Sequence, residues 1–121
     1  MANIKIEGQK ELQERLKKIE STAKTAIEQA LLNSALIVER DAKINAPVDT
    51  GRLRSSIMHR DKDFGTNEPM IEVGTNVEYA PYVEFGTSKA AAQPFLFPAL
   101  NSNKQKILKE IAKALKKGAG L

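Results

Sequence analysis

The stretch KELQERLKKIESTAKTAIEQALLNSALIVERDAKINAP, residues 10–47, decides the fold. No glycine or proline lies between Gly8 and Pro47, and small or apolar residues recur every three or four positions from Leu12 to Ile44. This period predicts one long helix that ends before Pro47, because proline disfavours helical geometry in the residue before it. About 35 helical residues extend roughly 50 Å, more than the diameter of a compact domain of this size. Part of the helix is therefore expected to pack against another chain.

Shorter elements are expected on both sides of this helix. Residues 3–7 alternate polar and apolar, which predicts an N-terminal strand. Residues 53–59, 70–73 and 79–85 carry β-branched or aromatic residues between glycines and predict an antiparallel meander. From about Leu100, apolar residues at helical spacing oppose a lysine face and predict a C-terminal amphipathic helix. The expected fold class is α+β, with a sheet of three to four strands, in a single domain over residues 1–121.

The composition lacks several residue types on which most enzyme classes depend. The chain has no cysteine and one histidine, His59, which excludes thiolate chemistry, Cys-ligated zinc, a pair of histidine ligands and a Ser-His relay. His59 is interpreted as structural or exposed. No apolar run is long enough to span a bilayer, and the first ten residues lack the apolar region of a secretion signal. We expect no enzymatic activity, no metal and no other cofactor.

Two motifs nevertheless resemble catalytic or metal-binding patterns. Asp49-Thr50-Gly51 is the triplet of aspartic proteases, but here it follows a helix-ending proline instead of an apolar strand. Four oxygen-bearing residues between positions 61 and 72 fit a calcium loop, but Thr66 replaces the glycine that its sharp turn requires. The preferred interpretations are a turn and a polar hairpin loop, and the protease stays as a third hypothesis.

Charge is segregated along the chain. Residues 61–84 hold six acids and one base, whereas residues 101–121 hold six lysines and one acid. Either both segments are solvated faces, or the acidic segment of one copy meets the basic helix of the next, a head-to-tail contact that closes rings. The net charge of +4 also fits the alternative hypothesis, a small non-enzymatic DNA-binding module.

Three stretches together resemble a known family: APVDTGRLRSSI (46–57), VGTNVEYAPYVEFGTSK (73–89) and QPFLFPAL (93–100). In this order and spacing they are similar to the tailed-phage head-tail joining, or tail-completion, family typified by gene product ten of a lambdoid coliphage. The chain departs from the family at Ala90-Ala91-Ala92, where the family often has Met and a Pro or Lys.

The resemblance implies a structural virion protein, assembled in the bacterial host cytoplasm and located at the head-tail junction. It implies a homo-oligomeric ring, of six subunits by the symmetry of the tail, through which DNA passes without specific binding. The implied partners are the neck or head-completion protein and the tail tube protein, with no membrane and no enzymatic activity.

Residues 47–51 are expected to form a structural turn. Pro47, Asp49 and Gly51 supply its chemistry and fix the direction in which the chain leaves the long helix. Residues 86–93 predict a small-residue loop that becomes ordered when it meets a neighbouring subunit.

Assembly contacts are expected mainly around the second and third of the resembling stretches. Tyr79, Tyr82 and Phe85 are spaced three apart and bring large apolar area to one margin of the sheet, as core residues or interface anchors. The residues predicted as assembly contacts are Arg52, Arg54, Glu78, Tyr79, Tyr82, Glu84, Phe85, Lys89 and Phe95.

Overall fold

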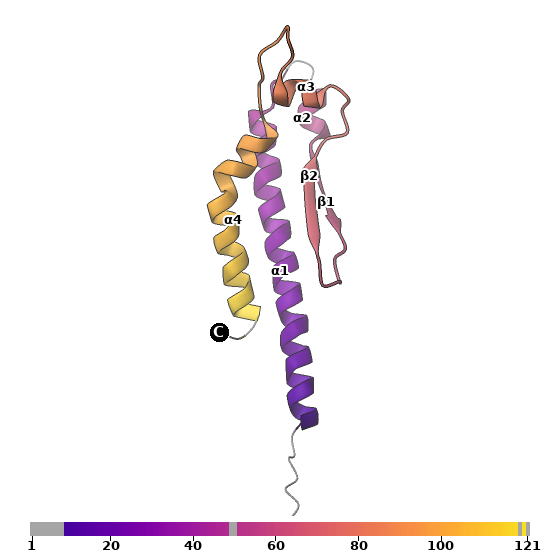
Figure 1. Ribbon diagram of the computed structural model, residues 1–121, viewed down its shortest axis with the longest axis vertical. Coiled ribbons are helices and arrows are strands. Elements are labelled where there is room, and N and C mark those ends of the chain that lie inside the picture. Colours follow the sequence, from indigo (N-terminus) through magenta and orange to yellow (C-terminus); the bar gives the residue numbers. More distant parts are fainter. Residues whose placement is uncertain (1–8, 49–50, 119, 121) are drawn as a thin grey trace, which may run out of the picture.

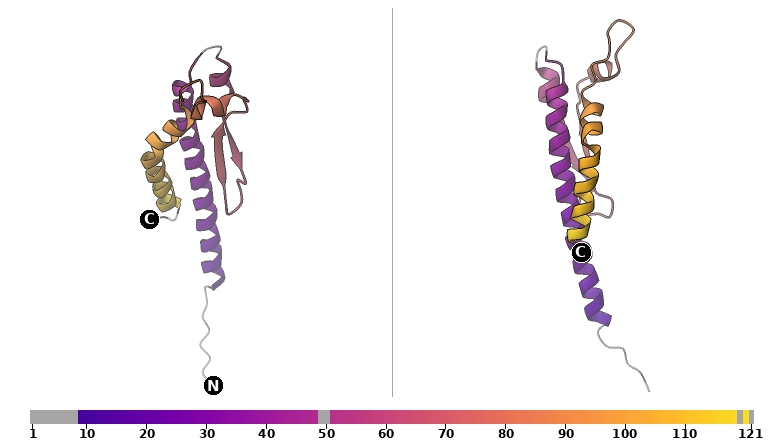
Figure 2. Two further views of the ribbon diagram at one scale, coloured as in Figure 1. Left: turned by 45° about the horizontal axis from the view of Figure 1, so that its top comes forward. Right: turned by 90° about the vertical axis from the view of Figure 1, so that its left-hand side faces the viewer.

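The structure, a computed structural model, describes residues 9–48, 51–118 and 120. Helix α1 is a rod that runs along most of the molecule, with α4 antiparallel on one side of it and the β1–β2 hairpin on the other (Figure 1, Figure 2). The fold is α+β, as predicted, with one antiparallel sheet of two strands among the described residues. The predicted strand at residues 3–7 lies outside the described residues. The elements are α1 (Gln9–Asn45), α2 (Arg52–Ser56), β1 (Met58–Lys62), β2 (Met70–Gly74), α3 (Ala80–Phe85) and α4 (Leu96–Gly118).

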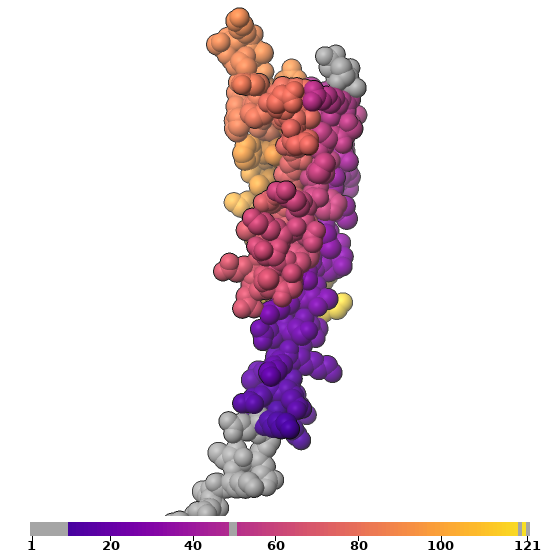
Figure 3. Space-filling view, turned by 90° about the vertical axis from the view of Figure 1, so that its right-hand side faces the viewer, coloured from indigo at the N-terminus to yellow at the C-terminus, as the bar shows by residue number. Residues whose placement is uncertain are grey.

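The long helix and the C-terminal helix are confirmed. Helix α1 ends two residues before Pro47, and α4 begins at Leu96, one turn earlier than the sequence predicted. Near its C-terminal end, α4 approaches α1 so closely that a Cβ on Gly118 would lie 2.6 Å from the Cα of Ala23. The first turns of α1 therefore extend beyond the end of α4 and beyond the hairpin (Figure 3). We call residues 9–22 the overhang.

The overhang carries an exposed apolar stripe. Leu12, Leu16 and Ile19 are 58%, 55% and 42% exposed, and they continue the helix face that α4 covers from Ala23 onward. Part of the long helix was expected to lie against something other than the sheet; α4 covers α1 from Ala23 onward, and the stripe on the overhang is exposed.

The hairpin is attached to α1 at two positions along the helix. The backbone N–H of Gly65, in the turn, donates to Glu28 Oε1 at 2.6 Å. On β1, His59 Nδ1 lies 2.7 Å from Glu39 Oε2, so the single histidine has a structural contact. These two contacts hold the hairpin parallel to the rod.

Two of the three predicted strands were wrong in whole or in large part. Residues 52–56 form α2, which follows Gly51 in the left-handed conformation (φ 79°) and buries Leu53, so strand β1 begins only at residue 58. Residues 80–85 form α3, with Pro81 in its first turn, where proline costs no hydrogen bond. Ala80 and Glu84 are its buried residues, and their spacing of four is helical.

The core lies at the C-terminal half of α1, where α2, α3 and the start of α4 meet. Its two largest fully buried side chains are Phe95 and Ile57. Alanines Ala42 and Ala99 are 0% exposed, and their small size lets α1 and α4 approach each other. The remaining buried members of the core are Val38, Ala46, Leu53, Val77 and Ala80.

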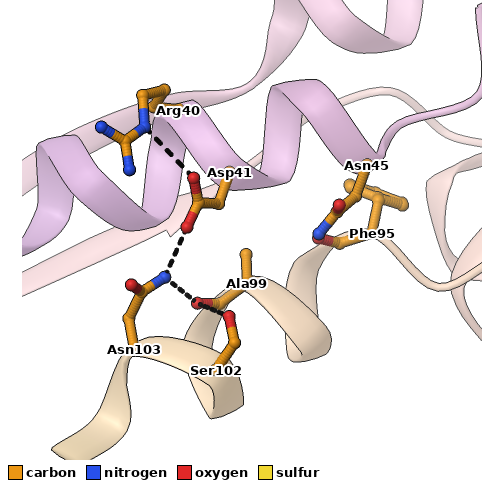
Figure 4. Close-up of polar contacts among 7 residues, drawn as sticks. All are labelled: Arg40, Asp41, Asn45, Phe95, Ala99, Ser102 and Asn103. Atoms are coloured by element: carbon orange, nitrogen blue, oxygen red, sulfur yellow. Dashed lines mark hydrogen bonds and ion pairs between the residues drawn. The ribbon is translucent and has the colours of Figure 1, made fainter. Parts of the chain in front are cut away.

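A polar contact joins α1 to α4 beside this core (Figure 4). Asn103 Nδ2 on α4 donates to Asp41 Oδ2 on α1 and to the carbonyl oxygen of Ala99, both at 2.7 Å. Arg40 Nε donates to the other carboxylate oxygen of Asp41 at 3.1 Å. The hydrogen bond from Asn103, helped by the Arg40 guanidinium, lowers the pKa of Asp41 below its ordinary value.

This carboxylate is expected to make the packing of α4 on α1 sensitive to acid. Because the folded-state pKa of Asp41 is depressed, its contribution to stability is present above the unfolded-state pKa and is lost as the pH falls through the folded-state pKa. Asp41→Asn is expected to destabilise the protein at neutral pH, and the difference from wild type is expected to shrink below about pH 4. Thermal unfolding across a pH series measures this, and a constant difference at all pH values would contradict it.

Candidate functional site

Three aromatic side chains are exposed at the end of the molecule that holds the core. Tyr82 and Phe85 on α3 are 63% and 69% exposed, and Phe97 in the first turn of α4 is 49% exposed. The rings of Phe85 and Phe97 touch, with centroids 5.8 Å apart. We call these three residues the aromatic patch. Exposed aromatic clusters of this kind mark surfaces that bind other proteins.

A pocket opens beside the aromatic patch. It has a volume of about 390 Å³ and lies between residues 74–78, α3 and the start of α4. Phe85 and Phe97 contribute exposed walls, whereas Val77, Ala80, Glu84 and Phe95 are the buried residues of its lining. The pocket therefore combines an apolar surface with one buried carboxylate.

Glu84 was predicted as an assembly contact, and within the subunit it is buried. The residue is 7% exposed, and its Oε1 accepts the backbone N–H groups of Phe95 and Leu96 at 3.3 and 2.8 Å. These N–H groups stand at the start of α4 and have no partner within the helix, so Glu84 caps α4. Glu84 Oε2 is buried and has no hydrogen-bond partner among the described residues.

Phe95 was also predicted as an assembly contact, and it lies inside the subunit. It is 1% exposed and packs in the core, whereas Phe97, two residues later, faces outward. Phe97 was not among the predicted contacts. The PFLFP pattern does not show which of the two phenylalanines is exposed.

Three of the other predicted contacts lie together within the subunit. Arg52 Nη2 is 3.4 Å from Glu78 Oε2, and its guanidinium stands 5.6 Å from the centre of the Tyr79 ring. Tyr79 packs against the core, while Arg52 and Glu78 keep most of their side chains exposed. This cluster borders the pocket through Glu78.

The predicted turn leads from α1 into α2. Gly51 has φ 79°, Pro47 is the second residue after the end of α1, and Asp49 lies outside the described residues. Arg54, another predicted contact, donates from Nε to the carbonyl oxygen of Lys43 at 2.8 Å. Arg54 thus satisfies one of the carbonyls left open at the C-terminal end of α1.

The chain between α3 and α4 forms a loop that projects from the same end of the molecule (Figure 1, Figure 2). Its base is held by hydrogen bonds from the N–H of Gln93 to the carbonyl of Val83 and from the N–H of Thr87 to the carbonyl of Ala90. Lys89 lies in this loop and is exposed. We call residues 86–94 the projecting loop.

Charge is distributed on two flanks of the rod. The hairpin, residues 58–74, holds four acids and two bases, whereas α4 holds six lysines and one acid. Figure 1 places these elements on opposite sides of α1. On the hairpin, Arg60 Nη2 pairs with Glu72 at 2.6 Å, and this hydrogen bond lowers the pKa of Glu72. The remaining acids and the α4 lysines are exposed.

The described part of the chain offers no metal-binding cluster of acidic or histidine residues. The residues that fitted a calcium loop lie on the two strands and the turn of the hairpin instead. Among residues 9–48, 51–118 and 120, no helix has the length and apolar character needed to cross a membrane.

A family model described as "Bacteriophage HK97-gp10, putative tail-component" matches residues 10–86. The chain belongs to this family. The HK97-gp10-like match runs from α1 to the end of α3 and includes Tyr82 and Phe85 of the aromatic patch. No curated protein and no solved structure matches the chain significantly. Membership in this family of phage tail components supports a structural, non-enzymatic role in the virion.

Proposed function

We propose that the protein is a head-tail joining subunit, a single unit over residues 1–121, that completes the phage tail by forming a ring. The observation that carries the proposal is the aromatic patch. Tyr82, Phe85 and Phe97 expose large apolar area at one end of a subunit from a tail-component family. Aromatic side chains of this kind supply much of the binding energy at protein interfaces.

The two charged flanks favour a ring over a two-fold symmetric dimer. A contact between the basic α4 of one subunit and the acidic hairpin of the next uses two different surfaces, so the pair keeps one free surface of each sign. Repetition of such a contact closes a ring when the rotation between neighbours divides a full turn. Six subunits match the symmetry that the family resemblance implies for the tail.

The two faces of this ring are proposed to bind different proteins. One face would bind the neck or head-completion protein and the other the tail tube protein, and DNA would pass through the centre. Contacts of the projecting loop and of exposed predicted contacts Arg52, Glu78 and Lys89 would contribute to assembly.

Replacing two patch residues tests the proposal. The double variant Tyr82→Ser, Phe85→Ser is expected to weaken self-association by about a hundredfold or more, because each anchor contributes on the order of 2 kcal/mol. Both side chains are more than half exposed, so the monomer is expected to keep its thermal stability. Sedimentation velocity and negative-stain electron microscopy measure the ring, and Leu36→Ser, an exposed apolar position on α1, is the matched control.

The role in the virion has its own test. In lysates of a phage that lacks this gene, filled heads and unjoined tails are expected to accumulate, and added wild-type protein is expected to restore infectious particles. The double variant is expected to fail in this assay while Leu36→Ser succeeds. Intact virions formed without the gene would contradict the joining role.

A DNA-binding module is the second candidate, and the exposed lysines of α4 favour it. None of the six makes an ion pair within the described residues. Fluorescence anisotropy with short duplex DNA over a salt series separates the two candidates, since counterion release predicts a steep loss of affinity with salt.

A further inference from the structure

The pocket beside the aromatic patch has the chemistry of a cation site. Two of its lining residues are acidic, the buried Glu84 and the exposed Glu78, and no basic residue lines it. Phe85 and Phe97 present aromatic surface at its exposed walls. Aromatic faces and a nearby carboxylate attract a cation, and apolar walls accommodate the methylene stem that carries it.

Glu84 explains why the pocket is suited to a cation. Its Oε1 is used by the start of α4, while its Oε2 is buried without a hydrogen-bond partner among the described residues. A carboxylate behind an apolar lining acts on charges in the pocket through a medium of lower dielectric constant than water. A cation that enters the pocket would therefore be attracted more strongly than one at the open surface.

Arg52 pairs with the pocket residue Glu78 within its own subunit, whereas Lys89 is an exposed cation at the same end of the molecule. It lies in the projecting loop, which leaves α3 at Gly86, directly after the pocket residue Phe85. The next three residues are alanines, so the loop is narrow around the lysine. Subunits of a ring related by rotation about an axis along the rod would hold the loop and the pocket at similar heights, because the loop lies at the same end of the molecule as α3 and the start of α4, which line the pocket (Figure 1).

We infer that the pocket of one subunit receives the Lys89 side chain of a second copy of this chain. This inference rests on the proposed ring and deepens it, since it assigns one contact between neighbours. The lysine stem would pack against the exposed surface of Phe85 and Phe97, and its ammonium group would face the Glu84 carboxylate. The projecting loop would then form the contact that joins each subunit to the next.

Cysteine cross-linking tests the contact directly, because the chain has no cysteine of its own. A Lys89→Cys variant is mixed with an Asn76→Cys variant, whose exposed side chain lines the pocket, and the mixture is oxidised. The expected product is a disulfide between two chains that carry different substitutions. Lys104→Cys, an exposed lysine on α4, replaces Lys89→Cys in the matched control and is expected to cross-link far less.

Affinity measurements test the chemistry of the pocket. Lys89→Ala is expected to weaken ring formation about tenfold, and Lys89→Arg, which keeps the cation, to stay near wild type. Glu84→Gln is expected to weaken it to a similar degree while keeping the cap, because the amide oxygen still accepts the α4 N–H groups. In the double variant Lys89→Ala, Glu84→Gln, the losses are expected not to add.

The outcomes distinguish this inference from the proposed ring. If rings form and neither Lys89→Ala nor Glu84→Gln changes their stability, or if Lys104→Cys cross-links as well as Lys89→Cys, the contact is refuted while the ring stands. In a double variant Lys89→Cys, Asn76→Cys, a disulfide that forms only within one chain would refute it too. A wild-type protein that stays monomeric at all concentrations would overturn both proposals.

Discussion

Phe95→Ala is expected to lower the free energy of unfolding by about 3–5 kcal/mol. Phe95 is 1% exposed and is one of the two largest fully buried side chains, so its removal leaves a cavity where α1, α3 and α4 meet. Small domains are stable by only about 5–15 kcal/mol, so the loss is a large share of the total. Urea unfolding followed by circular dichroism measures it.

Phe97→Ala is the matched control for this substitution. The two phenylalanines are two residues apart, but Phe97 is 49% exposed and is expected to change the free energy of unfolding by less than about 1 kcal/mol. In assembly the order is expected to be reversed. Phe97→Ala removes part of the aromatic patch and is expected to weaken ring formation more than Phe95→Ala does. Equal destabilisation by both substitutions would contradict the burial assigned to Phe95.

Gly86→Ala is expected to have the second large effect, because it should change both the conformation of the projecting loop and the formation of the ring. Gly86 has φ 79° and ψ 175°, a conformation that is almost restricted to glycine and costs other residues about 1–3 kcal/mol. A Cβ at this position would also lie 2.7 Å from the backbone nitrogen of Ala92. Both effects act at the base of the projecting loop, so we expect the loop to be displaced and ring formation to be lost.

Gly74→Ala is the control for the effect of a methyl group on its own. Gly74 ends β2, has no atom within 4 Å of a built Cβ and does not have the positive φ of Gly86. It is expected to leave the stability close to wild type, because the added methyl group meets no other atom. Ring formation by Gly86→Ala at wild-type affinity would show that the loop conformation is not needed.

The long helix could be predicted from the sequence because its period repeats over ten turns. The same reasoning failed for residues 79–85, which span less than two turns and contain aromatic residues typical of strands. Proline in the first turn and glycine at the end of α3 were signals of a helix as well as of a strand boundary. Short elements of this kind are decided by what they pack against, here the core and the start of α4.

The candidate site could be predicted from the sequence only in part, for a similar reason. Tyr82 and Phe85 are exposed as interface anchors should be, but Glu84 between them is buried. Charged residues are rarely buried without a partner, and the partners of Glu84 are backbone N–H groups 11 and 12 residues further along the chain. No local pattern shows that contact, because it depends on the direction in which α4 leaves the loop.

The overhang of α1 amplifies small changes in the direction of the helix. The helix has 37 residues, or about 55 Å, and its C-terminal end is held by the core. A change of about 10° in the direction of such a rod moves its free end by roughly 10 Å. A small adjustment of packing at the core end therefore becomes a large displacement at the N-terminal end of α1, which could change the width of any assembly that repeats it.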